Sequence, residues 1–292
     1  MQSTYDIQHV LWRIWSMQKA NSQTKLLIMT AQNPAVLSTK RRPLAAVKCG
    51  PQCHADINRV QGVSMYGQVY HNFTRPPQSL VEQFTGLWTA TLSDAMGMHG
   101  IMMPEIQPMF KGIQVLGVAF TVLNYPNDNI TTHKALLMAA PGDVLVIDEG
   151  RGNYMGSFGH NMSLQARKRG VVGVVTNGHA RDAKMLREEK FPIYCLGGCP
   201  RQSQKVRPGA INIPVSVGGV VISPGDIVVG DDDGVAVIPL SIAEEVLQRA
   251  KDRQEMEYQQ AKDIKSGKKP LEIVYGESWV DAALKGKITE FK

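Results

Sequence analysis

The sequence predicts an α/β layered fold, on three observations. From about residue 76, segments with apolar residues at helical spacing alternate with short runs rich in Val, Ile and Leu. A second β-rich stretch, broken by Gly, Pro and Asp, follows at residues 211–239. The composition, 43% hydrophobic and 20% charged over 292 residues, is that of an ordinary globular domain. Strands and helices that alternate in this way pack as layers.

The first half of the regular region predicts helices and strands in turn. Apolar residues recur at helical spacing from residue 76, at Leu80, Val81, Phe84 and Leu87. Ser93 and Asp94 then stand where side chains cap a second helix. Alternating, β-branched residues predict a strand at 112–126. A helix at 129–140 ends before Pro141, and a buried strand follows at 143–150.

The second half continues this alternation. The segment 157–170 is a helix with Arg167 to Arg169 facing outward, and Gly170 suits its end. The remaining segments predict a strand at 171–178, a helix at 180–190, a strand at 191–198, short strands within 211–239 and a long amphipathic helix at 241–264. Ser241 and Glu244 match a capping box for that last helix.

Residues 1–62 differ in composition from the rest of the chain. They hold eight of the 32 basic residues and two of the 26 acidic ones, so the remaining chain is neutral. A general nucleic-acid surface is therefore not expected. Three interpretations of this basic extension stay open: a disordered tail, an organelle-targeting peptide, or residues upstream of a true start at Met65. The main domain is expected at 65–292.

Neither membrane insertion nor a disulfide framework is expected. No apolar run approaches the roughly 18 residues that a membrane span needs. Cys49 and Cys53, beside His54, are open to a metal site, but free thiols are the favoured interpretation for them and for the other pair, Cys195 and Cys199. Reduced thiols and the lack of a secretory signal favour the cytoplasm.

The stretch Asn177–Asp182 carries the first candidate site. Asn177 and Gly178 end a predicted strand, where ligands gather in α/β sheets, and Gly178 would take a positive φ at the turn. Asp182 would lie in the first turn of the next helix, where the helix dipole favours an anion. Arg181 has no such structural reason, because a cation is disfavoured there. A guanidinium binds carboxylates and an aspartate binds hard divalent cations, so the pair indicates an acidic substrate bridged to a metal.

Two further stretches have both a functional and a purely structural interpretation. By the same topology, residues Gly159 to Met162 begin a helix after a buried strand, and their N–H groups would point into the same crevice to hold a carboxylate. A tight loop without function explains them equally well. Asp231 to Asp233 look like a metal cluster, but in a turn between strands we expect them to bind backbone groups and face solvent.

Together, these motifs resemble one family. "PGDVLVID", "GHNM" followed by an Ala and "RG", "GVVGVVTNGHARD", "FPIY" and "VGGVVISPGDIVVGDDDGVAVIP" are similar to the regulator of ribonuclease activity A-like (RraA-like) proteins and 4-hydroxy-4-methyl-2-oxoglutarate (HMG) aldolases. The resemblance runs from about Leu80 to about Arg249. It implies an α-β-β-α sandwich, assembled as a homotrimer or a dimer of trimers, with the site at a subunit interface.

The resemblance also implies an activity. Family aldolases cleave 4-hydroxy-2-oxo acids to pyruvate, many also decarboxylate oxaloacetate, and they use a divalent metal such as Mg²⁺ or Mn²⁺. The family's substrate-binding arginine falls on Arg181 and its metal-binding aspartate on Asp182. The loop whose backbone holds the pyruvyl group falls on Gly159, His160, Asn161 and Met162.

Two positions depart from the family pattern. His160 stands where the aldolases usually have an acid that orients a metal-bound water, and Asn177 stands where they usually have Asp. His160 is open to direct metal ligation or to an inert role. The main expectation is a metal-dependent, pyruvate-forming lyase. The alternatives are a non-catalytic trimeric regulator that binds a partner, and the same scaffold acting on a different oxo acid.

Overall fold

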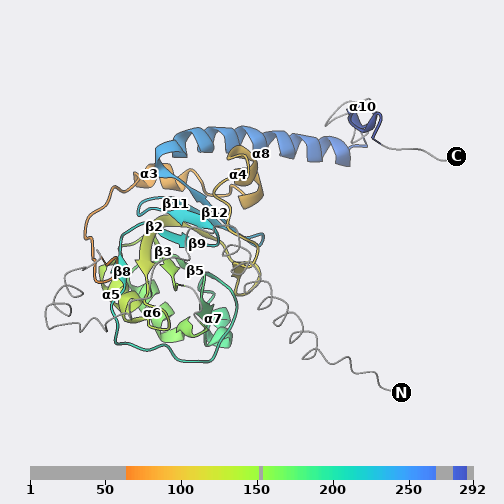
Figure 1. Cartoon of the computed structure of the whole chain (residues 1–292). Coiled ribbons are helices and arrows are strands. Elements are labelled where there is room, and N and C mark those ends of the chain that lie inside the picture. The colour runs from red at the N-terminus through yellow and green to blue at the C-terminus, as the bar shows by residue number, and fades with distance from the viewer. Residues whose placement is uncertain (1–63, 151–153, 268–278, 288–292) are drawn as a thin grey trace, which may run out of the picture. The chain divides into compact units, whose positions relative to one another are not determined.

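The computed structural model describes residues 64–150, 154–267 and 279–287 (Figure 1). The predictions for residues 1–62, including Cys49, Cys53 and His54, fall outside these ranges. Within them, no helix is long and apolar enough to cross a membrane.

An eight-stranded mixed sheet forms the centre of the domain. Its order is β1 (Gln107–Pro108), β7 (Ile193–Cys195), β5 (Gly173–Thr176), β3 (Asp143–Asp148), β2 (Val115–Leu123), β11 (Ile227–Gly230) and β12 (Val235–Ile238), and β8 (Ala210–Ile211) also pairs with β2. The strands β2, β3, β5 and β7 run parallel, whereas β11, β12, β1 and β8 pair antiparallel. The parallel strands are buried along nearly their whole length, as the apolar runs predict.

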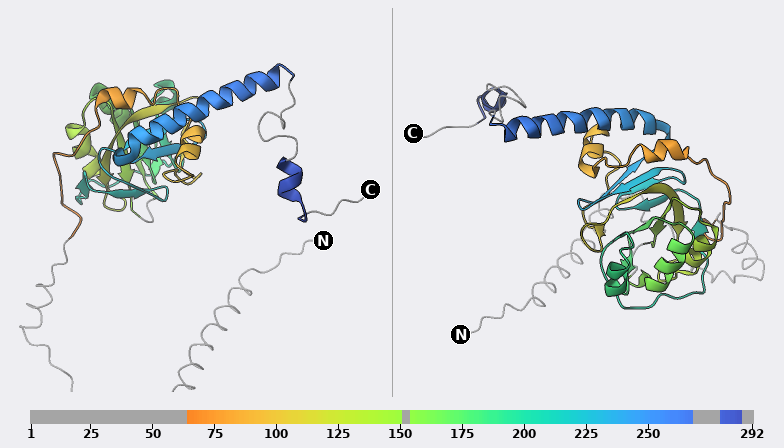
Figure 2. Two further views of the ribbon diagram at one scale, coloured as in Figure 1. Left: turned by 90° about the horizontal axis from the view of Figure 1, so that it is seen from above. Right: turned by 180° about the vertical axis from the view of Figure 1, so that it is seen from behind.

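Helices cover the outside of this sheet. In Figures 1 and 2, α3 (Gln78–Glu82), α4 (Thr89–Ala95) and α8 (Ala243–Lys265) lie on one side of it, and α5 (Ile130–Met138), α6 (His160–Lys168) and α7 (Ala183–Glu188) on the other. The first group packs on β2, β11 and β12, and the second group packs on β3, β5 and β7. Farther along the chain lies the short helix α10 (Trp279–Leu284).

The other face of the sheet curls around a third cluster. In this cluster, side chains of the sheet such as Val144, Val146 and Val237 pack against the hairpin of β9 (Val215–Val217) and β10 (Val220–Ile222). Tyr194 lies in this cluster, and its hydroxyl donates to the Ile113 carbonyl over 3.1 Å. Helices outside a curled sheet that packs on itself form the expected α-β-β-α sandwich.

The order of elements is as predicted, but two helix starts are not. Ser93 and Asp94 lie inside α4, which begins at Thr89 because a distant carboxylate caps it: Asp231 accepts the Thr89 N–H over 2.9 Å and the Thr89 hydroxyl over 2.6 Å. The capping box at α8 is also wrong. Ser241 belongs to the 3₁₀ turn η2 (Leu240–Ile242) and makes no side-chain cap bond, so a different N-cap, Ile242, precedes the helix.

Two of the three consecutive aspartates bind backbone groups, as expected. Besides capping α4, Asp231 accepts the N–H of Asp233, and Asp232 accepts the N–H of Gly112 over 2.7 Å. Burial first, and then the charges of Asp231 and Asp232, raise the pKa of Tyr194. These aspartates therefore hold the turn before β12 against neighbouring elements.

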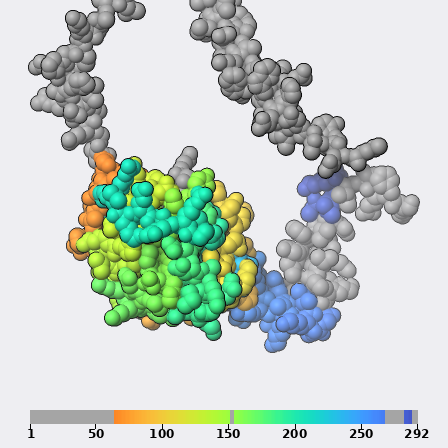
Figure 3. Space-filling model, turned by 90° about the horizontal axis from the view of Figure 1, so that it is seen from below, coloured from red at the N-terminus to blue at the C-terminus, as the bar shows by residue number. Residues whose placement is uncertain are grey.

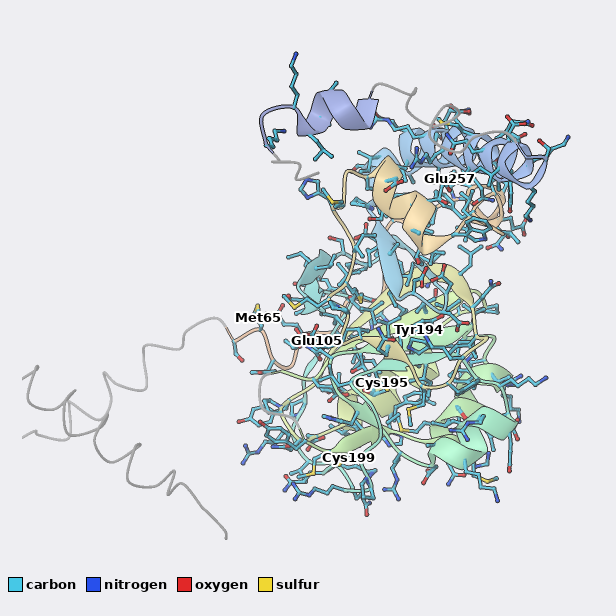
Figure 4. The ribbon with its side chains drawn as sticks, turned by 90° about the vertical axis from the view of Figure 1, so that its right-hand side faces the viewer. Met65, Glu105, Tyr194, Cys195, Cys199 and Glu257 are labelled. Atoms are coloured by element: carbon cyan, nitrogen blue, oxygen red, sulfur yellow. The ribbon has the colours of Figure 1, made fainter. Side chains whose placement is uncertain are left out.

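The described cysteines, Cys195 and Cys199, are free thiols, as predicted. Figure 4 labels both of them. Cys195 is buried in β7, and that burial raises its pKa. Cys199 lies in the following loop, where its thiol donates to the Tyr154 carbonyl over 3.0 Å.

Candidate functional site

A small two-stranded sheet, separate from the main one, brings the predicted site residues together. It consists of β4 (Gly156–Phe158) and β6 (His179–Ala180), which pair in parallel through Gly156↔His179 and Phe158↔Ala180. The Arg181 N–H extends the pairing by donating to the Phe158 carbonyl over 2.9 Å. Since the two strands end together, Gly159 and the Arg181–Asp182 pair meet at one edge.

Two glycines leave room for the arginine. A Cβ at Gly156 would lie 2.2 Å from the Cys199 carbonyl oxygen and 3.0 Å from Arg181 Cβ. A Cβ at Gly159 would lie 2.7 Å from both Arg181 Cγ and Asp182 Oδ2. Gly159 has extended backbone angles, so the close approach of other atoms, rather than its φ, requires glycine there.

Asp182 occupies a strained position that differs from the prediction. It precedes α7 instead of lying in its first turn, and its φ of 61° is left-handed. Its side chain does not cap its own helix. Instead, Oδ2 accepts the His160 N–H over 3.2 Å, and Oδ1 lies 3.5 Å from Arg181 Nε. Left-handed non-glycine residues cost energy and cluster at functional sites.

The start of α6 presents backbone N–H groups beside this pair, as the sequence predicts. The first N–H groups of any helix have no intrahelical acceptor. The His160 N–H goes to Asp182, and the Met162 N–H goes back to the Gly159 carbonyl over 3.0 Å. The Asn161 N–H has no acceptor among the residues that the structure describes, and the helix dipole favours an anion there.

These groups line a pocket of about 280 Å³. Figure 3 shows this side of the molecule, where the teal chain after β7 lies beside the green of α6 and α7. The predicted residues Gly159, Asn161, Met162, Arg181 and Asp182 all contribute to its wall. The other lining residues, which the sequence interpretation missed, are Asn129, His133, Gly156, Ser157, Gln202, Ser203 and Lys205.

Three of the missed side chains carry polar atoms with unused hydrogen-bonding capacity. Asn129 Oδ1, His133 Nε2 and Ser203 Oγ are buried, and none has a hydrogen-bond partner among residues 64–150, 154–267 and 279–287. Asn129 is 5% exposed and Ser203 4%. The amide nitrogen of Asn129 is already used, since it donates to the Ser157 carbonyl over 2.6 Å. Buried polar atoms of this kind need an explanation, and a ligand in the pocket supplies one.

A lysine lies close to these groups. Lys205 Nζ is 3.5 Å from the Ser203 carbonyl oxygen. Burial first, and then the charge of Lys205, lower the pKa of His133 below its ordinary value of 6.5. Both causes favour the neutral imidazole, so this end of the pocket places a lysine side chain beside neutral polar groups.

His160 does not point into the pocket. Its Nε2 lies 3.8 Å from Glu189 Oε1 at the end of α7, and only its backbone reaches Asp182. Direct metal ligation by this side chain, left open by the sequence, does not fit that orientation. Its Nε2 is also buried.

The Asn177–Gly178 pair serves the fold in an unexpected way. Gly178 is not among the positive-φ residues, so the predicted turn conformation is wrong. Glycine is required because a Cβ would lie 2.5 Å from Glu149 Cγ. Asn177 links the ends of β3 and β5: its amide nitrogen donates to Asp148 over 2.9 Å, and its oxygen accepts the Glu149 N–H over 2.8 Å.

A divalent cation fits one carboxylate of this site. In the described part of the chain, no three His, Cys, Asp or Glu side chains come together to hold a metal. Mg²⁺, however, keeps several waters and binds through one or two carboxylates. The Asp182 carboxylate, which is 40% exposed, offers such a ligand at the pocket wall.

Comparison with known proteins supports one family. The family model described as RraA-like, Aldolase/RraA, matches residues 89–237. A putative HMG aldolase of Halalkalibacterium halodurans is 40% identical over 175 residues, covering 60% of this chain and 83% of the relative. The HMG aldolase of Thermus thermophilus is 30% identical over 151 residues, covering 52% and 92%.

Solved structures agree with this result. An uncharacterized protein from Pseudomonas syringae pv. tomato has a TM-score of 0.61 and 29% identity, covering 69% of this chain and 99% of that one. A Streptomyces coelicolor protein, described as an unusual member of the RNase ES inhibitor RraA family, has a TM-score of 0.58 and 32% identity, covering 64% and 98%.

Proposed function

The chain belongs to the RraA-like family, and on that premise we propose that it is a divalent-metal-dependent lyase that forms pyruvate. Its substrate would be a 4-hydroxy-2-oxo acid of the HMG type, oxaloacetate, or both. The names of the relatives, putative and assigned HMG aldolases, support a carbon–carbon lyase. The observation that carries the proposal is the Arg181–Asp182 pair, with Asp182 held left-handed at the pocket wall.

The chain's own groups suit a 2-oxo acid. The Asn161 N–H at the start of α6 would hold the carboxylate next to the keto group. Arg181 would donate to the same oxygens, since a guanidinium binds planar carboxylates through two donors. Asp182, fixed by the His160 N–H, would hold Mg²⁺ or Mn²⁺ together with waters. When bound, that cation would stabilise negative charge on the keto oxygen as a Lewis acid.

We expect the working form to be a cytoplasmic homotrimer or a dimer of trimers, with a neighbouring subunit closing the pocket. The pocket opens to the surface in the single chain, and Arg181 and Asp182 keep 37% and 40% of their side chains exposed. A catalytic site that excludes water strengthens its electrostatic interactions. Burial by a second subunit would provide that exclusion.

A pyruvate-release assay tests the proposal. Purified protein is given oxaloacetate or HMG with Mg²⁺, Mn²⁺ or EDTA, beside the variants Asp182→Ala and Asp233→Ala. We expect metal-dependent turnover in the parent and in Asp233→Ala, an exposed acid away from the pocket, and its loss in Asp182→Ala. Unchanged turnover in Asp182→Ala would contradict the proposal.

A non-catalytic regulator is the second candidate. Its support is the likeness to the Streptomyces protein of the RNase ES inhibitor family and the position of His160, which stands where the aldolases usually have an acid and points away from the pocket. Absence of turnover with every metal in a folded oligomer, together with a stoichiometric protein partner in a pull-down, would favour it. Activity on neither substrate but on another oxo acid would favour the altered-substrate alternative.

A further inference from the structure

One wall of the pocket carries a histidine whose ring nitrogen has no partner. His133 lies in the first turn of α5 and lines the same pocket as Arg181 and Asp182. Its Nε2 is buried, and no described residue forms a hydrogen bond with it. Buried polar side-chain atoms that serve only the fold are normally hydrogen-bonded. A purely structural role for His133 therefore leaves Nε2 unexplained.

The surroundings of this histidine favour its neutral form. Burial first, and then the charge of Lys205, lower the pKa of His133. The other described charged side chains that line the pocket are the cation Arg181 and the acid Asp182, whose Oδ1 lies 3.5 Å from the arginine Nε. A neutral imidazole that keeps its proton on Nδ1 presents Nε2 as an acceptor. Nε2 can then take a proton from a ligand in the pocket.

We propose that His133 is the general base of carbon–carbon cleavage, and that its Nε2 takes the proton of the substrate's C4 hydroxyl group. This assignment rests on the proposed function, which holds the carboxylate and keto oxygens of the substrate at Arg181, Asp182 and the Asn161 N–H. C4 follows the three carbons of the pyruvyl group. Its hydroxyl group therefore extends past these three groups into the rest of the pocket, whose wall includes His133.

The same nitrogen completes the reaction in two steps. First, Nε2 takes the hydroxyl proton, the oxygen forms a carbonyl with C4, and the C3–C4 bond breaks. The electron pair of that bond passes to the pyruvyl fragment, which becomes the enolate of pyruvate. Second, the imidazolium returns the proton to C3, which gives pyruvate and restores the neutral imidazole. The cycle consumes no oxidant, reductant or further reactant.

The other described side chains of the pocket wall are less suited to this role. Arginine and lysine, as cations, are hydrogen-bond donors without an acceptor, which excludes Arg181 and Lys205. Asp182 is engaged by Arg181 and by the His160 N–H. The remaining lining side chains are amides, hydroxyls and a thioether, which do not take up protons near neutral pH. His133 is thus the described lining residue whose ordinary pKa lies closest to neutrality.

Two substrates separate the base from the rest of the site. Cleavage of HMG requires removal of the C4 hydroxyl proton, whereas oxaloacetate loses CO₂ from a carboxylate that is already ionised, and water can protonate the enolate that remains. Pyruvate release from both is measured with Mg²⁺ in the full-length parent and in His133→Gln. We expect HMG cleavage to fall by about 100- to 10,000-fold, the usual contribution of general acid–base catalysis, and decarboxylation to fall far less.

Rescue and pH profiles show whether the loss is chemical. Added imidazole should restore part of the HMG cleavage in His133→Ala but none in Asp182→Ala. In the parent, kcat/KM for HMG should fall as the pH drops below 6.5, because a protonated imidazole cannot accept a proton; this decline should be absent from the residual activity of His133→Gln. His99→Gln is the matched control, since His99 is exposed and does not line the pocket, and it should keep both activities. Thermal unfolding checks that each variant is folded.

The outcomes distinguish this proposal from the lyase proposal. Parental HMG cleavage in His133→Gln would overturn the base and leave the lyase intact. Equal losses on both substrates without rescue by imidazole would overturn it too, because they would show that His133 only shapes the pocket. Decarboxylation by a parent that does not cleave HMG would also remove the base alone. No pyruvate from either substrate in the parent would contradict both proposals.

Discussion

Replacing Gly159 by alanine should disable the site while leaving the fold intact. The new methyl group would lie 2.7 Å from Arg181 Cγ and 2.7 Å from Asp182 Oδ2. Carbon atoms are at their optimum about 3.5–4.0 Å apart, so Arg181 must retreat by close to 1 Å. Crowding of this size costs typically about 1–3 kcal/mol of stability. A misplacement of about 1 Å in a catalytic group lowers the rate on the order of 100-fold.

The measurement combines thermal unfolding with metal-dependent pyruvate release. Gly198→Ala is the matched control: it lies in the loop after β7, its φ is not left-handed, and its new methyl would meet only the flexible end of Met109 at 3.4 Å. We expect Gly198→Ala to keep both stability and activity. Wild-type turnover in Gly159→Ala would refute the reasoning, because it would show that this loop does not position the Arg181–Asp182 pair.

Three further predictions concern stability. Asp231→Ala removes the distant cap of α4 and should lower the unfolding free energy by about 1–2 kcal/mol in urea denaturation, whereas Asp233→Ala should change it little. The pKa of His133 is lowered in the folded state, so on acidification the unfolded chain takes up a proton at this histidine before the folded chain does. The unfolding free energy is therefore full above pH 6.5 and falls as the pH drops below it. His133→Gln should flatten that part of the plot of stability against pH. Arg75→Met leaves the fully buried carboxylate of Asp143 without its guanidinium and should cost about 3 kcal/mol, seen as a lower denaturation midpoint; an unchanged midpoint would show that the Ala140 N–H alone suffices.

The sequence predicted the alternation of strands and helices, because periodicity depends on residues close together in the chain. The predicted starts of α4 and α8 were wrong, because what begins a helix can lie far away in the chain. The group that caps α4 is Asp231, which lies 142 positions away, and no local pattern around Ser93 and Asp94 reveals it. The prediction of a positive φ at Gly178 was wrong for a similar reason, since the atoms that exclude a side chain there belong to the distant Glu149.

The residues of the candidate site also differ in how far the sequence alone predicts them. Gly159 and the Arg181–Asp182 pair were expected together, since each follows a parallel strand, and the structure brings them together. Asn129, the residue before α5, and His133 in its first turn were missed, although they stand four residues apart and so lie on the same side of the chain there. Ser203 and Lys205 lie in a stretch between β7 and β8 without regular periodicity. Nothing in that stretch indicated which side chains turn inward.

The pairing of β4 with β6 also limits which insertions and substitutions the pocket can tolerate. It joins the two connections that carry Gly159 and Arg181, and its register shifts between the pairs Gly156↔His179 and Phe158↔Ala180. Inserting a residue within β4 or β6 would turn the side chains that follow it in that strand to the opposite face. The stretch between β7 and β8 meets this pair through single bridges, the last at Gln202, and Ser203 and Lys205 follow that bridge. Gln204 is bridged in turn to Asp128, so laboratory evolution toward new substrates should favour substitutions at Ser203 and Lys205 over changes in the length of this stretch.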